Sequence, residues 1–427
     1  MSRIVGVAEA HLGIAVSGGG DSVALMHLAA RRGGALRVAT VDHGLRDGSA
    51  GEAGAVARSA AALGLPHETL HWTWNGAGNL QASARAGRRA RLERWAAQHR
   101  LAGILLGHTQ DDQAETLLLR LARGSGVEGL SAMTEGRLGQ AAFLRPLLEV
   151  GRGDLRGWLR ENGIPWSDDP SNEDERFERV RARRAIAALG LDPARLAATA
   201  ARMSRAREAL ERRSLAVAGE VVRAALPGDV ALDRDGLLAA EEDTRRRILA
   251  GALRCVAGAD YRPAETEMTR VLGTVREGGA RTLMGCAIRV DGTRLLIHRE
   301  TAAVAGTRIG PRGVWDGAWR VADAPPGTEV GALGAVGLMR IAADPGERPE
   351  GGTAFDGLPE GYPRAALAAK PALWRGGELA GFAPLGWGEP HDLAWLPPGG
   401  PFPDCLATRG RTHAAGGLRP SAFHPPD

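Results

Sequence analysis

The amino-acid sequence predicts an α/β fold: a doubly wound parallel sheet, then a mainly helical domain, then a small C-terminal domain that contains β-strands. Three observations support this prediction. Short apolar runs alternate with longer helical patterns over residues 12–160, which is typical of parallel sheets. An arginine-rich helical pattern follows over residues 193–272, and the last part of the chain is rich in Gly, Pro and Trp with short β-like runs. We therefore expect domains at residues 1–190, 191–303 and 304–427.

In the first domain each predicted strand is a short apolar run, and each predicted helix is long enough to cross back over the sheet. Strands are expected at residues 12–16, 37–41, 67–74, 101–106 and 141–144, and helices at 22–31, 51–63, 79–99 and 110–123. Residues 164–184 are expected to form a loop that leads into a basic helix. Residues 282–298 resemble a hairpin with Asp291-Gly292 as its turn. Parallel sheets bind ligands beyond the carboxyl ends of their strands, so functional residues are expected there.

The composition is that of a folded protein and excludes several classes of enzyme. The chain has 427 residues, of which 44% are hydrophobic and 24% charged, with a net charge of +4. Its only lysine is Lys370, which follows no glycine-rich loop, so lysine-dependent kinases and P-loop GTPases are not expected. Three widely spaced cysteines, Cys255, Cys286 and Cys405, favour a reducing compartment over a disulfide framework. Because no apolar run approaches the roughly 20 residues of a membrane helix, we expect a cytoplasmic protein without a membrane partner.

A glycine-rich turn follows the first predicted strand and leads directly into a helix. Its sequence is Ser17-Gly18-Gly19-Gly20-Asp21-Ser22. Glycines let the backbone approach an anion closely, and the N–H groups of a helix start bind phosphate. The serine hydroxyls add donors, and Asp21 is suited to hold the Mg²⁺ of a triphosphate. The alternative is a structural turn in which Ser17 or Asp21 caps the helix.

Two further motifs follow predicted strands of the same sheet. Asp42 and His43 come at the end of the second strand, where they either line a nucleotide pocket or form a capped turn. His108, Asp112 and Glu115 share one face of the helix after the fourth strand. A helix cap explains part of this acidic pattern. A zinc site would need a second His or Cys at ligand spacing, which this segment lacks. Two acids beside a phosphate site instead suit magnesium or a cationic substrate such as an amine.

Taken together, these motifs resemble the tRNA(Ile)-lysidine synthase family. The strings that carry the resemblance are SGGGDS (17–22), VDHGLR (41–46), GHTQDDQAETLLLRLARGSGVEGLSAM (107–133), RPLL (145–148) and DDPSNED (168–174). The first string is similar to the pyrophosphatase-type phosphate loop, so the resemblance implies a sheet of the PP-loop ATPase type. The match is specific over residues 12–185. Residues 191–303 are more loosely similar to the family's tRNA-contacting domain, and residues 304–427 to its C-terminal domain, which we also expect to contact tRNA.

The resemblance implies a ligase that forms a carbon–nitrogen bond in two steps. ATP first adenylates the carbonyl oxygen at carbon 2 of the wobble cytidine, in the CAU anticodon of an isoleucine tRNA, and pyrophosphate leaves. The side-chain amine of free lysine then displaces AMP, which gives lysidine. The implied substrates are ATP with Mg²⁺, lysine and tRNA, and no obligate protein partner is expected.

The resemblance also assigns residues to roles. Residues 17–22, with Asp42 and His43, would bind ATP, and Arg46 would lie near the nucleotide. Asp21 would hold Mg²⁺, Asp112 and Glu115 would bind lysine, and these three acids form the implied catalytic set. Arg85 and Arg88 would lie near the target base or its phosphates. Arg179, Arg181 and Arg183 belong to a basic cluster that we expect to contact the tRNA, the alternative being a solvated helix face.

The sequence departs from the family pattern at three positions and leaves two other functions open. Phe177 and Val180 stand where tyrosine and asparagine are common, and Arg89 stands where tyrosine is usual, so the hydrogen bonds of those side chains are not expected here. An RNA thiolase of the same fold would need paired cysteines. A nucleotide-binding RNA module without catalysis would require Asp112 and Glu115 to be purely structural.

Overall fold

The computed structural model describes residues 11–44, 48–74, 76, 80–133, 136–138, 141–168, 174–259, 261–343, 361–397 and 400–406. Arg46 and residues 169–173 of the sequence motifs lie outside these ranges. The described chain divides into two compact units, one ending at Glu208 and the other beginning at Ala209. The domain boundaries near 190 and 303 stay a prediction. Among the described helices, none combines the length and the apolarity needed to cross a bilayer.

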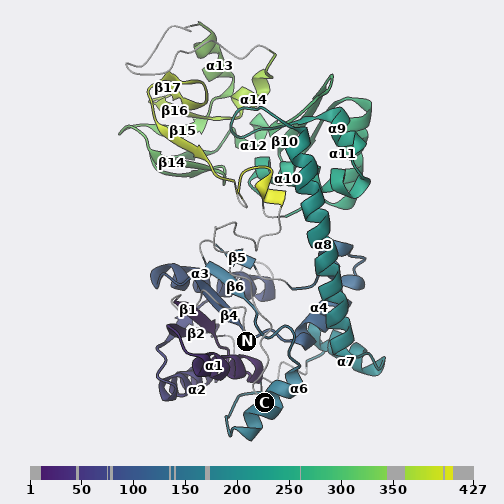
Figure 1. Ribbon diagram of the computed structural model, residues 1–427. Helices are drawn as coiled ribbons and strands as arrows, with labels where there is room; N and C mark the ends of the chain where they lie inside the picture. Colours follow the sequence, from purple (N-terminus) through teal and green to yellow (C-terminus); the bar gives the residue numbers. More distant parts are fainter. Residues whose placement is uncertain are drawn as a thin grey trace. The chain divides into compact units, whose positions relative to one another are not determined.

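The first unit is built on a six-stranded sheet with the order β3-β2-β1-β4-β6-β5 (Figure 1). Five strands are parallel: β1 (Leu12–Ala15), β2 (Leu36–Asp42), β3 (His67–His71), β4 (Gly103–Leu106) and β6 (Ala141–Leu144). The edge strand β5 (Gly136–Leu138) pairs antiparallel with β6. The predicted parallel sheet is confirmed. The sequence did not predict β5, because three residues are too few to show a strand pattern.

Helices cover both faces of this sheet, as in a doubly wound fold. On one face, Ile14 and Val38 of the sheet share a core with α1 (Gly20–Arg32), α2 (Ser49–Ala62) and α6 (Arg152–Glu161). On the other, Trp95 of α3 (Leu80–Gln98) packs with Ala39 and Ile104. The remaining helices are α4 (Gln110–Leu121), α5 (Val127–Leu130), α7 (Glu178–Ala188) and α8 (Pro193–Val221). Every residue of β1 is buried, on both faces of the sheet, which is typical of a parallel sheet covered on both sides.

The second unit contains three antiparallel sheets. The first has the order β7 (Val222–Arg223), β8 (Val230–Asp233), β11 (Arg294–Arg299), β10 (Cys286–Asp291) and β9 (Gly279–Leu283), and it packs with α9 (Arg234–Ala239), α10 (Glu242–Ala257) and α11 (Glu265–Glu277). The predicted hairpin is β10 and β11, with Asp291 paired to Arg294 across the turn. Thr282 and Leu283, which the prediction assigned to the hairpin, belong to β9.

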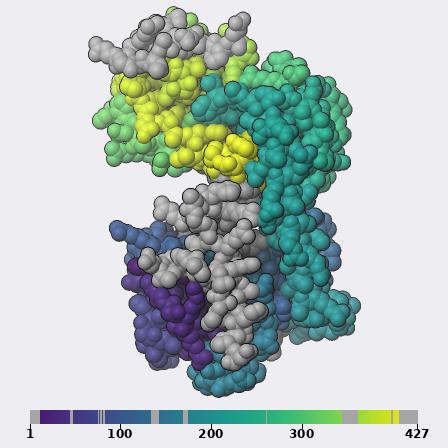
Figure 2. Space-filling model, in the orientation of Figure 1, coloured from purple at the N-terminus to yellow at the C-terminus, as the bar shows by residue number. Residues whose placement is uncertain are grey.

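The other two sheets confirm a β-containing C-terminal part. One has the order β12 (Arg308–Ile309), β15 (Glu329–Ala332), β16 (Pro371–Arg375), β17 (Glu378–Phe382) and β18 (Trp387–Gly388). The other has β13 (Gly313–Trp315), β14 (Trp319–Asp323) and β19 (Asp392–Trp395). The short helices are α12 (Thr301–Val304), α13 (Gly334–Ala343), α14 (Arg364–Ala368), η2 (Ala383–Leu385) and η3 (Asp404–Leu406). The helix η3 contacts α10, and Figure 2 shows yellow residues from the end of the described chain beside teal residues of the same unit.

The single lysine is a structural residue of the second unit. Lys370 Nζ lies 2.8 Å from Asp229 Oδ2 and donates a hydrogen bond of 2.7 Å to the carbonyl of Pro227. Both charged side chains are buried, and the hydroxyl of Tyr362 also donates to Asp229. A lysine held in this way is not placed to bind a phosphate or form a Schiff base.

The fold brings two of the three cysteines, which are widely spaced in the sequence, close together. All three are free and buried, yet Cys255 of α10 and Cys405 of η3 lie together. The Cys405 thiol and burial raise the pKa of the Cys255 thiol well above its ordinary value, and burial raises the pKa of Cys286 to about 12. A thiol must ionise to act as a nucleophile, so these shifts disfavour Cys255 and Cys286 as nucleophiles at neutral pH.

Candidate active site at the carboxyl edge of the parallel sheet

The phosphate loop connects β1 to α1 and is braced by its own serines. The Ser17 amide donates to Ser22 Oγ at 3.1 Å, and the Ser22 hydroxyl donates to the carbonyl of Gly19 at 2.9 Å. The loop therefore uses Ser22 to hold its shape. Within the described residues, the amides of Gly20 and Asp21 at the start of α1 have no hydrogen-bond acceptor. Such groups are the ones that bind anions at helix starts.

The acids of α4 are held at the end of the neighbouring strand, β4. Asp112 Oδ2 accepts hydrogen bonds from the Thr109 amide at 2.8 Å and the Thr109 hydroxyl at 3.1 Å, so the expected cap is present. Its Oδ1 faces arginines instead, with Arg179 Nη1 at 3.5 Å. Glu115 is 1% exposed, and its Oε1 accepts a hydrogen bond from Arg183 Nε at 2.9 Å. The cap accounts for one oxygen of Asp112 but for no part of Glu115.

An arginine that the sequence did not single out joins these acids to the phosphate loop. Arg152, the first residue of α6, has Nε 3.0 Å from Asp21 Oδ2, Nη2 3.2 Å from Asp112 Oδ1 and Nη1 3.4 Å from Glu115 Oε1. Burial alone would lower the pKa of its guanidinium, but Asp112, Asp21 and Glu115 raise that pKa above its ordinary value. The predicted catalytic acids therefore lie on the same rim of the sheet as the loop.

The three acids leave two oxygens for other ligands. Asp21 Oδ1 and Glu115 Oε2 are buried and have no hydrogen-bond partner in the described chain. A buried carboxylate oxygen without a partner is costly, and a cation satisfies it. Asp21 thus fits Mg²⁺, and Glu115 fits an ammonium group. The described residues hold no group of three or more His, Cys, Asp or Glu that would bind a metal unaided, and protein-bound Mg²⁺ commonly relies on substrate phosphates.

His108 lies beside these acids as a neutral imidazole. Its Nδ1 accepts a hydrogen bond from Arg145 Nε at 3.1 Å. Burial and the Arg145 charge lower the pKa of His108 to about 4, although Asp112 acts in the opposite direction. His108 is therefore uncharged at neutral pH and does not compete with a cation for Asp112.

Asp42 and His43 lie at the end of β2, as predicted. The Gly44 amide donates to Asp42 Oδ1 at 2.9 Å, and this bond, with the Ser49 side chain, lowers the pKa of Asp42. These contacts match the capped-turn alternative, and ATP binding by Asp42 stays a prediction. The His43 ring meets Trp72 edge-on, with centroids 5.5 Å apart, and burial followed by the Arg88 charge lowers the pKa of His43. A neutral imidazole beside an indole suits a nucleobase better than a phosphate.

The predicted tRNA-binding arginines differ in what they contact: Arg179 and Arg183 contact the acids of α4, and Arg181 does not. Arg88 of α3 is half-buried, and its pKa is lowered by burial and by the nearby charges of Arg179 and Arg85. Arg179 and Arg183 contact the acids of α4, whereas the exposed Arg181 donates to the backbone carbonyl of Glu175 at 2.8 Å. The structure thus brings part of the predicted RNA set to the predicted lysine site. Of the departures, Phe177 precedes α7, Val180 is buried within it, and Arg89 is exposed on α3.

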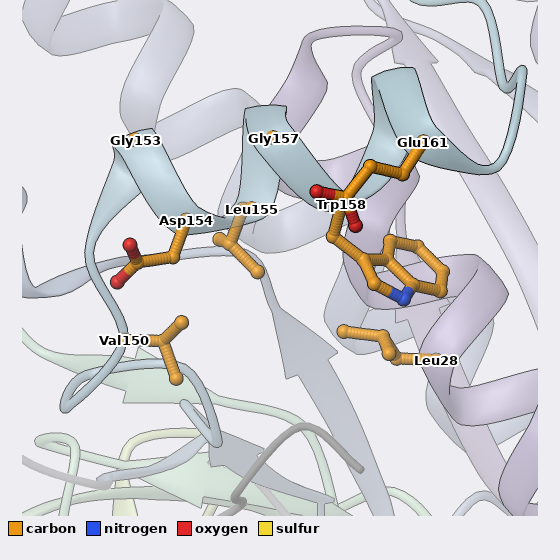
Figure 3. Close-up of a pocket in the computed structure, with 8 residues that line it drawn as sticks. All are labelled: Leu28, Val150, Gly153, Asp154, Leu155, Gly157, Trp158 and Glu161. Carbon is orange, nitrogen blue, oxygen red and sulfur yellow. The ribbon is translucent and has the colours of Figure 1, made fainter. Parts of the chain in front are cut away.

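A separate cavity of about 350 Å³ lies beside α6 and is not lined by these acids. Its walls include Leu28 of α1 and Leu155 and Trp158 of α6 (Figure 3). None of the predicted site residues lines it. The site is therefore defined by converging charges on the sheet edge rather than by this cavity, which Asp154 and Glu161 also line.

Comparison with known proteins agrees with this arrangement. A family model described as "PP-loop domain" matches residues 3–189. The tRNA(Ile)-lysidine synthase of Ruegeria pomeroyi is 45% identical over 88% of this chain and 88% of its own. The enzymes of the same name from Methylobacterium nodulans and Mesorhizobium japonicum are 42% and 34% identical, over 69% and 88% of this chain and 91% and 84% of their own. Given this identity over most of both chains, the chain belongs to the tRNA(Ile)-lysidine synthase family.

Proposed function

We propose that this protein is a carbon–nitrogen ligase that joins free lysine to carbon 2 of the wobble cytidine in the CAU anticodon of an isoleucine tRNA. ATP is consumed, and the products are lysidine, AMP and pyrophosphate. The observation that carries this function is the 45% identity with a tRNA(Ile)-lysidine synthase over 88% of both chains. Residues 1–190 would catalyse the reaction, and residues 191–303 and 304–427 would contact the tRNA.

In the first step, the cytosine carbonyl oxygen attacks the α-phosphorus of ATP. A phosphorus–oxygen bond forms, and the bond to pyrophosphate breaks. The free amides of Gly20 and Asp21 support phosphate binding by the loop at residues 17–22. Mg²⁺, held by Asp21 together with the phosphates, would neutralise charge that develops on pyrophosphate.

In the second step, the lysine amine attacks carbon 2, and the bond from that carbon to the adenylate oxygen breaks to release AMP. Asp112 and Glu115 lie close enough together to share Arg152, and the Glu115 Oε2 atom is without a partner among the described residues. Both features support binding of lysine through one of its ammonium groups. The nearby Arg179 and Arg183 would bring RNA to the same place, so that the amine and the base meet.

One assay tests the function against its two alternatives. The purified protein, without any other protein, is incubated with ATP, Mg²⁺, labelled lysine and the unmodified tRNA. We expect AMP release that depends on lysine, with label joined to the tRNA, and no labelling of a tRNA that carries uridine at the wobble position. Sulfur incorporation from a sulfur donor would instead identify a thiolase, which the buried, high-pKa thiols of Cys255 and Cys286 disfavour. Binding of ATP and tRNA without turnover would identify a module that lacks catalysis.

A further inference from the structure

Arg152 contacts residues that the reaction uses in different steps. Asp21 belongs to the phosphate loop, whereas Asp112 and Glu115 belong to α4 and the lysine site. Each of the three guanidinium nitrogens contacts a different one of these carboxylates. The side chain is 16% exposed, and the Arg152 amide donates to Asp111 Oδ2 at 2.7 Å, which fixes the start of α6 as well. One side chain thus connects both halves of the site.

The contacts of Arg152, together with the hydrogen bond from Arg183 Nε to Glu115 Oε1, determine which carboxylate oxygens remain for substrates. It contacts Oδ2 of Asp21 and Oε1 of Glu115, and the opposite oxygens, Asp21 Oδ1 and Glu115 Oε2, are the ones without a hydrogen-bond partner in the described ranges. On Asp112 it contacts Oδ1, while Oδ2 accepts from Thr109. Each half of the site therefore presents one unpaired oxygen.

We propose that Arg152 is a positioning residue that binds one oxygen of Asp21 and one of Glu115, and so directs the other oxygen of each toward Mg²⁺ and the lysine ammonium group. This inference rests on the proposed roles of Asp21 and Glu115. Three carboxylates gathered at one place repel one another, and the positive charge between them reduces that repulsion. A guanidinium has its donors in a fixed plane and spans separate acceptors, whereas an ammonium group at the end of a flexible chain does not fix them in the same way.

The proposal predicts that loss of Arg152 affects both steps at once. Pyrophosphate release from ATP and tRNA without lysine measures the first step, and the KM for lysine in the full reaction reports on the second site. For Arg152→Ala we expect slower pyrophosphate release and a higher lysine KM, each by roughly 10- to 100-fold, the usual effect of removing a side chain that orients ligands. Glu115→Gln, by contrast, should raise the lysine KM and leave pyrophosphate release much less changed.

Chemical rescue and charge retention separate positioning from a purely structural ion pair. Ethylguanidinium added to Arg152→Ala should restore part of both activities, because it supplies the planar group without the chain. Arg152→Lys keeps the charge and should recover little activity in either step. Arg160→Ala is the matched control, since Arg160 is exposed on the same helix and should leave both measurements unchanged.

A failure of the Arg152 proposal and a failure of the proposed function give different results in these experiments. If the wild-type protein does not join lysine to tRNA, the proposed function fails whatever the variants do. If the wild type is active, then full activity of Arg152→Lys, or wild-type values for both steps in Arg152→Ala, overturns the role of Arg152. Should Arg152→Ala not fold, Arg152→Lys decides alone: a folded variant impaired in both steps supports the proposal, and an active one refutes it.

Discussion

Gly107, the first residue after β4, lies directly against the backbone of Ser22 in the phosphate loop. A Cβ at position 107 would stand 2.9 Å from Ser22 Cα and 3.0 Å from Ser22 N. Because β4 and β1 are paired, the segments that follow them leave the sheet next to each other. The missing side chain allows the acidic helix α4 to begin close to the phosphate loop.

We expect Gly107→Ala to weaken ATP binding, because the methyl group would press on backbone atoms that cannot rotate away. Overpacking of this kind costs about 1–3 kcal/mol, which corresponds to an ATP Kd raised by roughly 5- to 150-fold if the loop takes up the strain. Calorimetric titration with ATP measures the change. Gly157→Ala is the control, since no atom lies within 4 Å of its Cβ position. An unchanged Kd in Gly107→Ala would show that the close approach does not shape the loop.

We expect Asp21→Asn to lower AMP formation by roughly 100-fold or more, the scale seen when a charge-stabilising group is lost from an active site. The amide keeps the size of the side chain and an oxygen for Arg152, but it removes the charge that would hold Mg²⁺. AMP formation is measured over a series of Mg²⁺ concentrations, with circular dichroism as the test of folding. Asp154→Asn, an exposed change on α6, should have no effect. Full activity of Asp21→Asn would end the magnesium assignment.

The sequence was most informative about the elements of the first unit. The strands β1, β2, β3, β4 and β6 were predicted within a few residues of their observed bounds. Four of them contain short apolar runs, whereas β3 has the mostly polar sequence His-Glu-Thr-Leu-His. The motifs that follow these strands were predicted to share one sheet edge, and Arg152 links two of them, the loop through Asp21 and α4 through Asp112.

The role of Arg152 was beyond sequence reasoning. Arg152, Arg156 and Arg160 recur every four residues along α6, and nothing in that spacing distinguishes them. Only the fold shows that the first reaches three acids, while Arg156 pairs with Asp168, whose side chain is 61% exposed. For the same reason Arg179 and Arg183 looked like part of a basic RNA-binding helix, although they also contact Asp112 and Glu115. Such contacts join segments that are far apart in the chain, so the spacing of residues in the sequence does not predict them.

We expect Arg181→Ala and Arg183→Ala to have different effects. Arg181 is exposed and donates hydrogen bonds only to backbone carbonyls in the described chain. If it binds one tRNA phosphate, its loss should reduce the slope of log affinity for tRNA against log salt concentration by about one unit and leave the lysine KM unchanged. Arg183 contacts Glu115, so its loss should also change the lysine KM. Filter binding at several salt concentrations and steady-state kinetics supply the two readouts. An unchanged salt slope in Arg181→Ala would remove this residue from the RNA interface.

We expect the pH dependence of stability to report the neutral state of His108. Its pKa in the folded protein is lowered to about 4 by burial and Arg145, against an ordinary value of 6.5. Between these two values the unfolded chain binds a proton at this residue and the folded chain does not. The free energy of unfolding should therefore fall as the pH drops from 6.5 toward 4, by up to about 1.4 kcal/mol per pH unit from this residue. Above pH 6.5 the ring is neutral in both states, so this residue no longer makes the free energy of unfolding depend on pH.

His108→Gln tests this sign directly, because glutamine offers Arg145 an acceptor oxygen but does not titrate. Urea unfolding of both proteins is measured at pH values from neutrality down to 4. Carboxylates titrate in the same range, so the informative quantity is the difference between the two proteins at each pH. That difference should be constant above pH 6.5 and should move in favour of the variant as the pH falls. A constant difference throughout would mean that His108 takes up a proton equally in the folded and unfolded states, and that its Nδ1 does not keep the Arg145 hydrogen bond as the pH falls.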